Sequence, residues 1–169
     1  STSFERKVGA SLCKASELAM SDKLPKFRLV SAPTGGSKTT SSIALLAMLA
    51  NEDKGFTGAY ICKTIEECEY VYRRLNKLVD PSVLAVYSSL HKHEASPTKL
   101  LEKKKEIGLE IHDHFDSMDL PKSRLIITTH CRWKKEYEDE IDLGVRKYKG
   151  NQRDLIIIDE EPELVSIFP

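Results

Sequence analysis

Residues suited to binding phosphate lie together between positions 31 and 40 of the 169-residue chain. Small residues there let the backbone wrap closely around a phosphate, with N–H groups pointing inward and a helix start adding positive potential. The candidate binding residues are Pro33, Thr34, Gly35, Gly36, Ser37, Lys38, Thr39 and Thr40. Lys38 is expected to reach the β- and γ-phosphates of a nucleotide, and the Thr39 hydroxyl to hold Mg²⁺. The segment therefore predicts a P-loop, the phosphate-binding loop that joins a strand to a helix.

Two carboxylates follow an apolar segment late in the sequence. Residues 155–158 are one Leu and three Ile, and Asp159 and Glu160 come directly after them. In a parallel sheet, the end of this strand lies at the same edge as the P-loop. Asp159 could then hold Mg²⁺ through its water shell, and Glu160 could orient or deprotonate an attacking water. Lys38 and Glu160 are accordingly the candidate catalytic residues, and Thr39 and Asp159 are the candidate metal ligands.

Short apolar segments alternate with longer amphipathic ones around these residues, which is typical of βα units and a parallel sheet. Strands are predicted at 27–31, 59–63, 83–88, 124–129 and 155–159, and helices at 4–20, 38–50, 64–79, 98–111 and 133–141. A polar loop rich in Lys, Gly and Asn is expected before the last strand. The last two strands are continuously apolar, as expected where helices cover both faces of a sheet. We therefore expect a single α/β domain over residues 1–169, with a mostly parallel central sheet flanked by helices.

The P-loop and the paired carboxylates resemble motifs of the superfamily 2 helicases. Residues 32–39 have the family's Ala-Pro-Thr-Gly-x-x-Lys-Thr form, in which Ala commonly replaces the first Gly. Residues 159–162 read Asp-Glu-Glu-Pro, which looks like a variant of the D-E-A-D or D-E-x-H box. The order and spacing of the motifs extend over residues 27–162, which is nearly the whole chain.

Candidate nucleic-acid contacts come from the same resemblance. Residues 124–133 are similar to the family's strand-then-Thr motif, which touches the nucleic-acid backbone, and Thr129 and Arg132 fall on the matching positions. Thr64, at the expected start of a helix, is a weaker match to the family's first strand-contacting motif. The alternative interpretation of Thr129 is a helix cap, and that of Arg132 is a solvated charge. Trp133 is expected to pack at the helix start rather than to stack on a base.

The resemblance implies a RecA-like P-loop NTPase domain, the first of two motor domains, with ATP and Mg²⁺ as its ligands. In the intact proteins, hydrolysis of ATP moves or remodels DNA or RNA, and arginines of a second RecA-like domain complete the ATP site. We therefore expect a single strand of DNA or RNA as a partner, and a longer protein that supplies the second RecA-like domain. Ser37 stands where the family has Gly, and a positive φ there would cost roughly 1–2 kcal/mol and weaken nucleotide binding.

Composition and charge argue against several classes of protein. The chain has 26 basic and 26 acidic residues, whereas a tight, autonomous nucleic-acid binder usually has a basic surplus. No apolar run approaches the ~20 residues of a membrane span, and no signal peptide is recognisable, so we expect no membrane partner and a cytoplasmic location. The cysteines, which form no C-x-x-C pair, are expected to be reduced structural thiols: Cys13, Cys62, Cys68 and Cys131.

Two alternative functions stay open at this point. A degenerate P-loop domain would hold nucleotide or a partner without turnover, and a stand-alone P-loop NTPase or kinase would turn over by itself. A GTPase is disfavoured, because no Asp-x-x-Gly follows the strand at 155–159 and no Asn-Lys-x-Asp occurs. A second RecA-like domain with an arginine-rich motif, in a longer sequence, would favour the motor over both alternatives.

Overall fold

The structure, a computed structural model, describes residues 38–88 and 120–159, together with Ala10, Thr98, Glu102 and Lys105. The predicted strand at 27–31, the opening helix and most of the predicted helix at 98–111 lie outside the described residues. Five of the candidate binding residues (positions 33–37) and the candidate catalytic residue Glu160 also lie outside them. The fold and the site are therefore described from the two continuous ranges.

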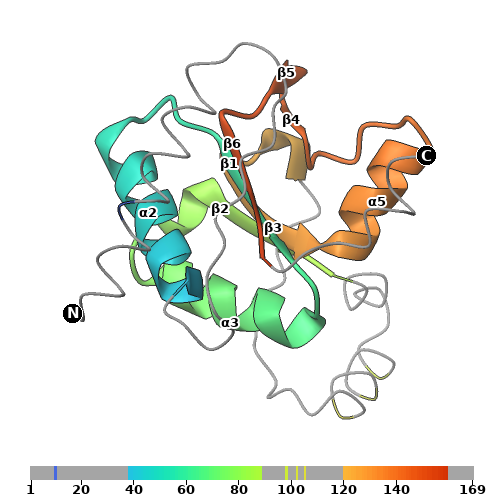
Figure 1. The fold of residues 1–169 in the computed structure, drawn as a ribbon, viewed down its shortest axis with the longest axis horizontal. Coiled ribbons are helices and arrows are strands. Elements are labelled where there is room, and N and C mark those ends of the chain that lie inside the picture. Colours follow the sequence, from blue (N-terminus) through green and yellow to red (C-terminus); the bar gives the residue numbers. More distant parts are fainter. Residues whose placement is uncertain are drawn as a thin grey trace.

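Within the described ranges, four parallel strands form a sheet in the order β2-β3-β1-β6 (Figure 1). Their bounds are Gly58–Cys62 for β1, Leu84–Tyr87 for β2, Leu125–Thr129 for β3 and Leu155–Ile158 for β6. Each of the four predicted strands in the described ranges is confirmed to within one residue at either end. Gly58 pairs with both Leu125 and Leu155, so the three strands begin level with one another. Their carboxyl ends consequently share one edge of the sheet.

Three α-helices accompany the sheet within the described ranges: α2 (Lys38–Glu52), α3 (Ile65–Asn76) and α5 (His130–Glu138). Short 3₁₀ helices, η1 (Pro81–Val83) and η3 (Leu120–Lys122), precede β2 and β3. The helix predicted at 133–141 instead begins at His130, because the Thr129 side chain caps its first turn, and it ends before Glu140, whose φ of 51° is left-handed. No helix in this part of the chain is long and apolar enough to cross a membrane.

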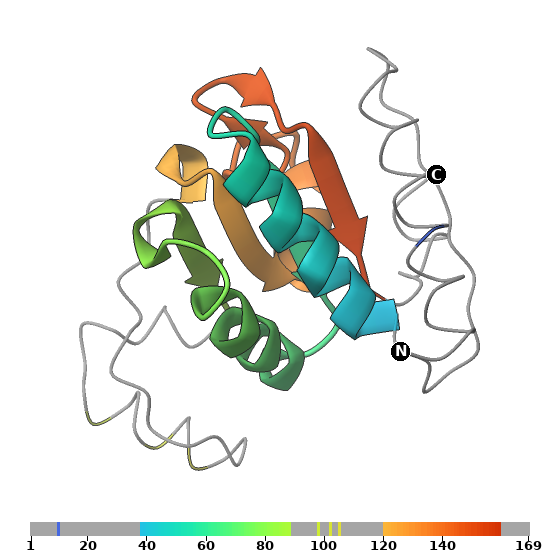
Figure 2. The same cartoon turned by 90° about the vertical axis from the view of Figure 1, so that its left-hand side faces the viewer.

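Helices cover both faces of the sheet, and successive side chains of a strand enter different cores. From β1, Tyr60 and Cys62 belong to the core shared with α2 and α3, whereas Ala59 and Ile61 belong to the core shared with α5. Figure 2 shows α2 and α3 side by side over the sheet. Trp133 of α5 is 3% exposed and lies in the second core, which confirms the prediction that it is a packing residue.

Glycine at the start of β1 allows α2 to approach the sheet closely. A Cβ at Gly58 would lie only 2.7 Å from Cδ1 of Leu46, a fully buried residue of α2. Real Cβ atoms do not come this close to another carbon, so a side chain here would force the end of the Leu46 side chain to shift. The position of α2 matters for the site, because its first turn carries the candidate phosphate ligands.

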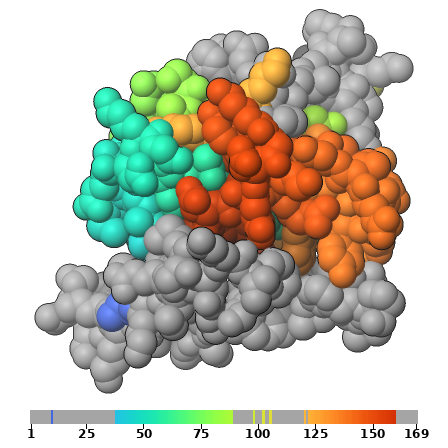
Figure 3. Space-filling model, turned by 90° about the horizontal axis from the view of Figure 1, so that it is seen from above, coloured from blue at the N-terminus to red at the C-terminus, as the bar shows by residue number. Residues whose placement is uncertain are grey.

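The polar segment before β6, predicted above as a loop, contains an antiparallel hairpin of β4 (Lys147–Tyr148) and β5 (Asn151–Gln152). Lys149 and Gly150 connect the two strands with φ values of 48° and 83°, as a two-residue type I′ turn requires. In Figure 3 the red hairpin residues lie between the teal residues near the end of α2 and the orange residues of α5. The strands are polar and only two residues long, so the sequence carries no apolar alternation that would indicate them.

Two buried charges attach the hairpin segment to the domain. The Glu136 side chain is 1% exposed. Its carboxylate accepts hydrogen bonds at 2.8–3.0 Å from the backbone N–H groups of Leu143, Val145 and Arg146. The same carboxylate forms an ion pair with the Arg146 side chain at 2.8 Å. Burial lowers the pKa of Arg153 to about 10, so this side chain is still charged at neutral pH. Its guanidinium donates to the backbone carbonyls of Leu120, Ser123, Arg124, Gly144 and Val145.

We predict that Glu136→Ala lowers the free energy of unfolding by about 3 kcal/mol or more, because it leaves several buried donors without an acceptor. The matched control is Glu138→Ala on the same helix, whose side chain is 47% exposed and should change stability by no more than about 0.5 kcal/mol. Urea denaturation followed by circular dichroism measures both. Equal effects of the two substitutions would show that Glu136 does not hold the hairpin segment.

Candidate functional site

Thr39 and Asp159 meet at the carboxyl edge of the sheet although 120 residues separate them. Thr39 lies in the first turn of α2, Asp159 follows β6, and the Thr39 hydroxyl donates to Oδ2 of Asp159 at 3.1 Å. Figure 2 shows the cyan start of α2 beside the red arrowhead of β6. The Asp159 N–H donates to the carbonyl of Ile61 at 2.9 Å, which continues the pairing of β1 and β6. The structure thus brings together the two residues predicted as metal ligands.

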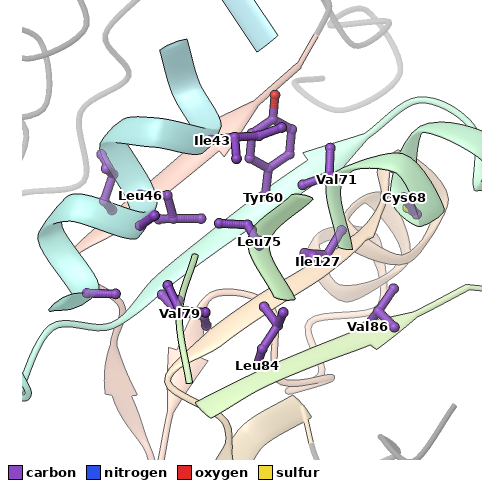
Figure 4. Packing of buried hydrophobic residues seen from close by; sticks show 14 of the residues in the cluster. Ile43, Leu46, Tyr60, Cys68, Val71, Leu75, Val79, Leu84, Val86 and Ile127 are labelled. Atoms are coloured by element: carbon purple, nitrogen blue, oxygen red, sulfur yellow. The ribbon is translucent and has the colours of Figure 1, made fainter. Parts of the chain in front are cut away.

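The same carboxylate oxygen accepts a second hydroxyl, from Tyr60 of β1, at 3.2 Å. In Figure 4 the Tyr60 ring lies beside Ile43 of α2, and its oxygen points away from the other labelled side chains. Burial and then the negative charge of Asp159 raise the pKa of Tyr60 above its ordinary value of 10.0, so the hydroxyl stays protonated and can donate. Tyr60 was not predicted; its one signal is that it carries the only hydroxyl in the apolar strand β1.

His130 makes a third contact with Asp159, this time with its main chain. The His130 Nε2 atom lies 3.0 Å from the carbonyl oxygen of Asp159. A carbonyl oxygen can only accept, so Nε2 carries a hydrogen and donates it. His130 was not predicted either, because nothing in a single sequence shows that the first residue of α5 faces the end of β6.

The oxygen atoms at this edge fit Mg²⁺, which prefers hard oxygen ligands and usually takes only one or two carboxylates besides water and phosphate. Thr39 Oγ1 and Asp159 Oδ2 lie 3.1 Å apart, near the separation of about 2.9 Å between adjacent ligands of an octahedral Mg²⁺. Residues 38–88 and 120–159 contain no cluster of three or more His, Cys, Asp or Glu side chains that could form a closed metal cage. Lys38 and Thr40 share the first turn of α2, the former half-buried and the latter exposed.

Thr64 and Thr129, two of the candidate nucleic-acid contacts, are helix caps at the same edge of the sheet. Thr64 accepts from the N–H of Glu67 at 3.2 Å, and the Glu67 carboxylate reaches back to the N–H of Thr64, which completes a capping box for α3. Thr129 caps α5 by accepting from the N–H of Arg132. Because Thr129 pairs in register with Cys62, the two helices start at the ends of neighbouring strands, and they then cover opposite faces of the sheet.

Arg132, the third candidate contact, is half-buried and is held by neighbouring residues of the domain. Its guanidinium stacks 3.9 Å from the centre of the Tyr87 ring and donates to the carbonyl of Leu143 at 3.1 Å. Burial lowers the pKa of Arg132, and its Nε atom is buried with no hydrogen-bond partner among the described residues. Arg132 is thus a half-buried charge with partners inside the domain, and Thr129 is a helix cap, as its alternative interpretation has it.

The cysteines of the described ranges are free thiols, as predicted. Cys62 ends β1 and is fully buried beside Cys68 of α3. A hydrogen bond with Cys68, together with burial, raises the pKa of Cys62 well above its usual range. Because the thiolate is the reactive form, Cys62 is an inert packing residue despite its place next to the site. Cys131, on α5, is exposed.

We predict that Tyr60→Phe lowers the free energy of unfolding at neutral pH by about 0.5–1.5 kcal/mol, because Asp159 loses a buried donor. The raised pKa means that the Tyr60 contribution is fully present below pH 10.0 and is lost as the pH rises above that value. The deficit of Tyr60→Phe should therefore shrink in urea titrations at increasing alkaline pH. Tyr70→Phe, at a side chain that is 46% exposed, is the control. A deficit that stays constant with pH would contradict the buried Tyr60–Asp159 contact.

Comparison with known proteins leaves the site to be interpreted from its own residues. No protein-family model matches the chain, and no curated protein sequence is significantly similar to it. The contacts around Asp159 are consequently the observations from which a function has to be inferred.

Proposed function

We propose that this domain binds Mg·ATP at the carboxyl edge of its sheet and forms the ATP-binding half of a nucleic-acid-dependent ATPase or helicase motor. The observation that carries the proposal is the hydrogen bond between the Thr39 hydroxyl and the Asp159 carboxylate. One group comes from the first turn of a helix and the other from the end of a parallel strand, which is the arrangement that holds Mg²⁺ in P-loop NTPases. A parallel sheet covered on both faces supports the same proposal, since ligands of such sheets bind at the carboxyl ends of strands.

Each candidate residue has a distinct role in this proposal. The start of α2 offers backbone N–H groups and positive potential to phosphate, and Lys38 adds a full charge against the β- and γ-phosphates. Mg²⁺, when bound, neutralises charge on the phosphates. Tyr60 holds the orientation of Asp159, because its hydroxyl and that of Thr39 meet on one carboxylate oxygen. Glu160 orients or deprotonates the attacking water.

A nucleic-acid strand is proposed to lie across the starts of α3 and α5. Both helices begin at the same edge, so their free N-terminal N–H groups and dipoles could receive consecutive backbone phosphates. In α3, however, the Glu67 carboxylate already occupies the N–H groups of Lys63 and Thr64, which leaves the start of α5 as the stronger contact. With zero net charge, the affinity for a strand should be low and should fall steeply with salt.

We predict that Mg·ATP binds weakly and that Lys38→Ala abolishes this binding, because Lys38 in the first turn of α2 would place a full positive charge against the β- and γ-phosphates. Titration calorimetry measures the dissociation constants. Lys54→Ala is a matched control, since Lys54 is exposed in the turn beyond the other end of α2. Equal binding by wild type and Lys38→Ala would refute the nucleotide site.

We further predict that the 169 residues alone release almost no phosphate from ATP, with or without single-stranded DNA or RNA. In the proposed motor, arginines from a second RecA-like domain stabilise the charge that develops on the γ-phosphate, and such an arginine contributes ~10³–10⁵ in rate. Steady-state phosphate release, compared with Glu160→Gln, tests this. Robust turnover that nucleic acid does not stimulate but Glu160→Gln removes would favour a stand-alone NTPase instead. Nucleotide binding with no turnover in any longer form of the protein would favour a degenerate binding module.

A further inference from the structure

The backbone ladder between β1 and β6 ends at Asp159, one bond short of holding this residue on both sides. The Asp159 N–H donates to the Ile61 carbonyl at 2.9 Å. In a parallel ladder, the next bond would run from the N–H of Lys63 to the Asp159 carbonyl. That N–H donates to the Glu67 carboxylate at 3.0 Å, as part of the turn that starts α3. The capping of α3 thus takes from Asp159 the donor that continued pairing would supply.

His130 supplies a donor to this carbonyl from a strand that does not pair with β6. It follows β3, whereas Asp159 follows β6, and β1 lies between them. Two strand spacings are about 10 Å, so the His130 side chain extends across the end of β1. Its Nε2 atom lies 3.0 Å from the Asp159 carbonyl oxygen. A side chain of α5 therefore occupies the place of the missing backbone donor.

The contact from His130 determines how the Asp159 side chain leaves the backbone. Peptide groups are planar, so holding the N–H on one side of a Cα atom and the carbonyl on the other restrains both φ and ψ of the residue. Ile61 provides the first of these restraints and His130 the second. The far end of the side chain is held separately, by the hydroxyls of Thr39 and Tyr60 on one carboxylate oxygen. Loss of the His130 contact leaves the carboxylate tied at its tip but not at its base.

We propose that His130 is a positioning residue that raises the affinity of the proposed nucleotide site for Mg²⁺ by holding the main chain of Asp159. This inference rests on the proposed function, in which Asp159 holds the metal ion. Metal-binding groups tolerate only about 0.5 Å of misplacement, and residues that support a metal ligand typically contribute about 10–100-fold to metal affinity. His130 itself binds neither the metal nor the nucleotide and acts only through the Asp159 carbonyl.

The test measures how much Mg²⁺ strengthens nucleotide binding in each variant of the 169-residue chain. A fluorescent ADP analogue is titrated in excess Mg²⁺ and then in EDTA, and the Mg²⁺ gain is the dissociation constant in EDTA divided by that in Mg²⁺. The wild type should show a gain well above one. His130→Ala should remove about a factor of ten of this gain and leave the dissociation constant in EDTA nearly unchanged.

Two amide variants test whether the donor at Nε2 is the cause. In His130→Gln the amide nitrogen is as many bonds from Cα as Nε2 is, so this variant should restore part of the gain. In His130→Asn the amide nitrogen is one bond closer to Cα, where Nδ1 lies, so this variant should resemble His130→Ala. Cys131→Ala is the matched control, since Cys131 is the exposed neighbour on α5 and should keep the wild-type gain.

The outcomes separate the inference from the proposed function. A merely structural role of His130 would weaken binding in Mg²⁺ and in EDTA alike, so an unchanged gain in His130→Ala would overturn the inference. Equal gains in His130→Gln and His130→Asn, or a wild-type gain of one, would also overturn it. In each of these cases binding that Lys38→Ala abolishes would leave the nucleotide site standing. Wild-type protein that binds no nucleotide, or binding that survives Lys38→Ala, would overturn the proposed function and the inference together.

Discussion

The carboxylate of Asp159 is the group on which the rest of the site depends. It is only 8% exposed, and removing a carboxylate from water costs several kcal/mol unless hydrogen bonds or counter-charges compensate. Here the compensation comes from hydroxyls of a helix and of a neighbouring strand, donated to the same oxygen. These donors have to be in place before the charge can be buried. The requirement ties the position of α2 to that of the sheet, since Thr39 and Tyr60 come from these two layers.

Because Asp159 needs donors from both α2 and β1, packing contacts between α2 and the sheet also affect the candidate site. Gly58 lets the Leu46 side chain of α2 lie against the start of β1. The Tyr60 ring packs in the core under α2 while its hydroxyl reaches the edge, so a single side chain belongs both to the core and to the site. A core substitution under α2 should therefore affect the geometry at Asp159 as well as stability. The domain has no sharp division between its framework and its candidate site.

The sequence predicts structure well where a pattern of residue types has one common structural explanation. Apolar runs predicted the four strands to within one residue, the Thr64 and Glu67 pair carries the signature of a capping box, and the strand-edge argument predicted that Thr39 and Asp159 would meet. The sequence is uninformative where the role of a residue depends on which groups the fold brings beside it. A tyrosine in an apolar strand gives the same pattern whether or not its hydroxyl finds a carboxylate.

The same ambiguity applies to charged residues in polar segments. Glu136 and Arg153 occur among many Lys, Arg, Asp and Glu residues, and only their burial at 1% and 4% distinguishes them from solvated charges. Most of their partners are backbone groups, whose availability no side-chain pattern reveals. His130 was hidden for a similar reason, because its acceptor is a main-chain carbonyl 29 residues away. Hydrogen bonds to the backbone are thus the part of this site that patterns of residue types do not predict.

The pairing of β1 with β6 has a consequence for how the domain reaches its folded state. Thr57 and Asp154, just before these two strands, are joined across 97 residues, and Thr39 and Asp159 across 120. Contacts between such distant segments form only after the entropy of loop closure has been lost, so parallel pairing of this kind is slow. During synthesis, β1 and β3 can pair while β6 is still inside the ribosome. The edge of β1 that pairs with β6 then stays unpaired until β6 emerges. The proposed nucleotide site is therefore completed only when β6 joins, so any species able to bind nucleotide there should have β6 paired with β1.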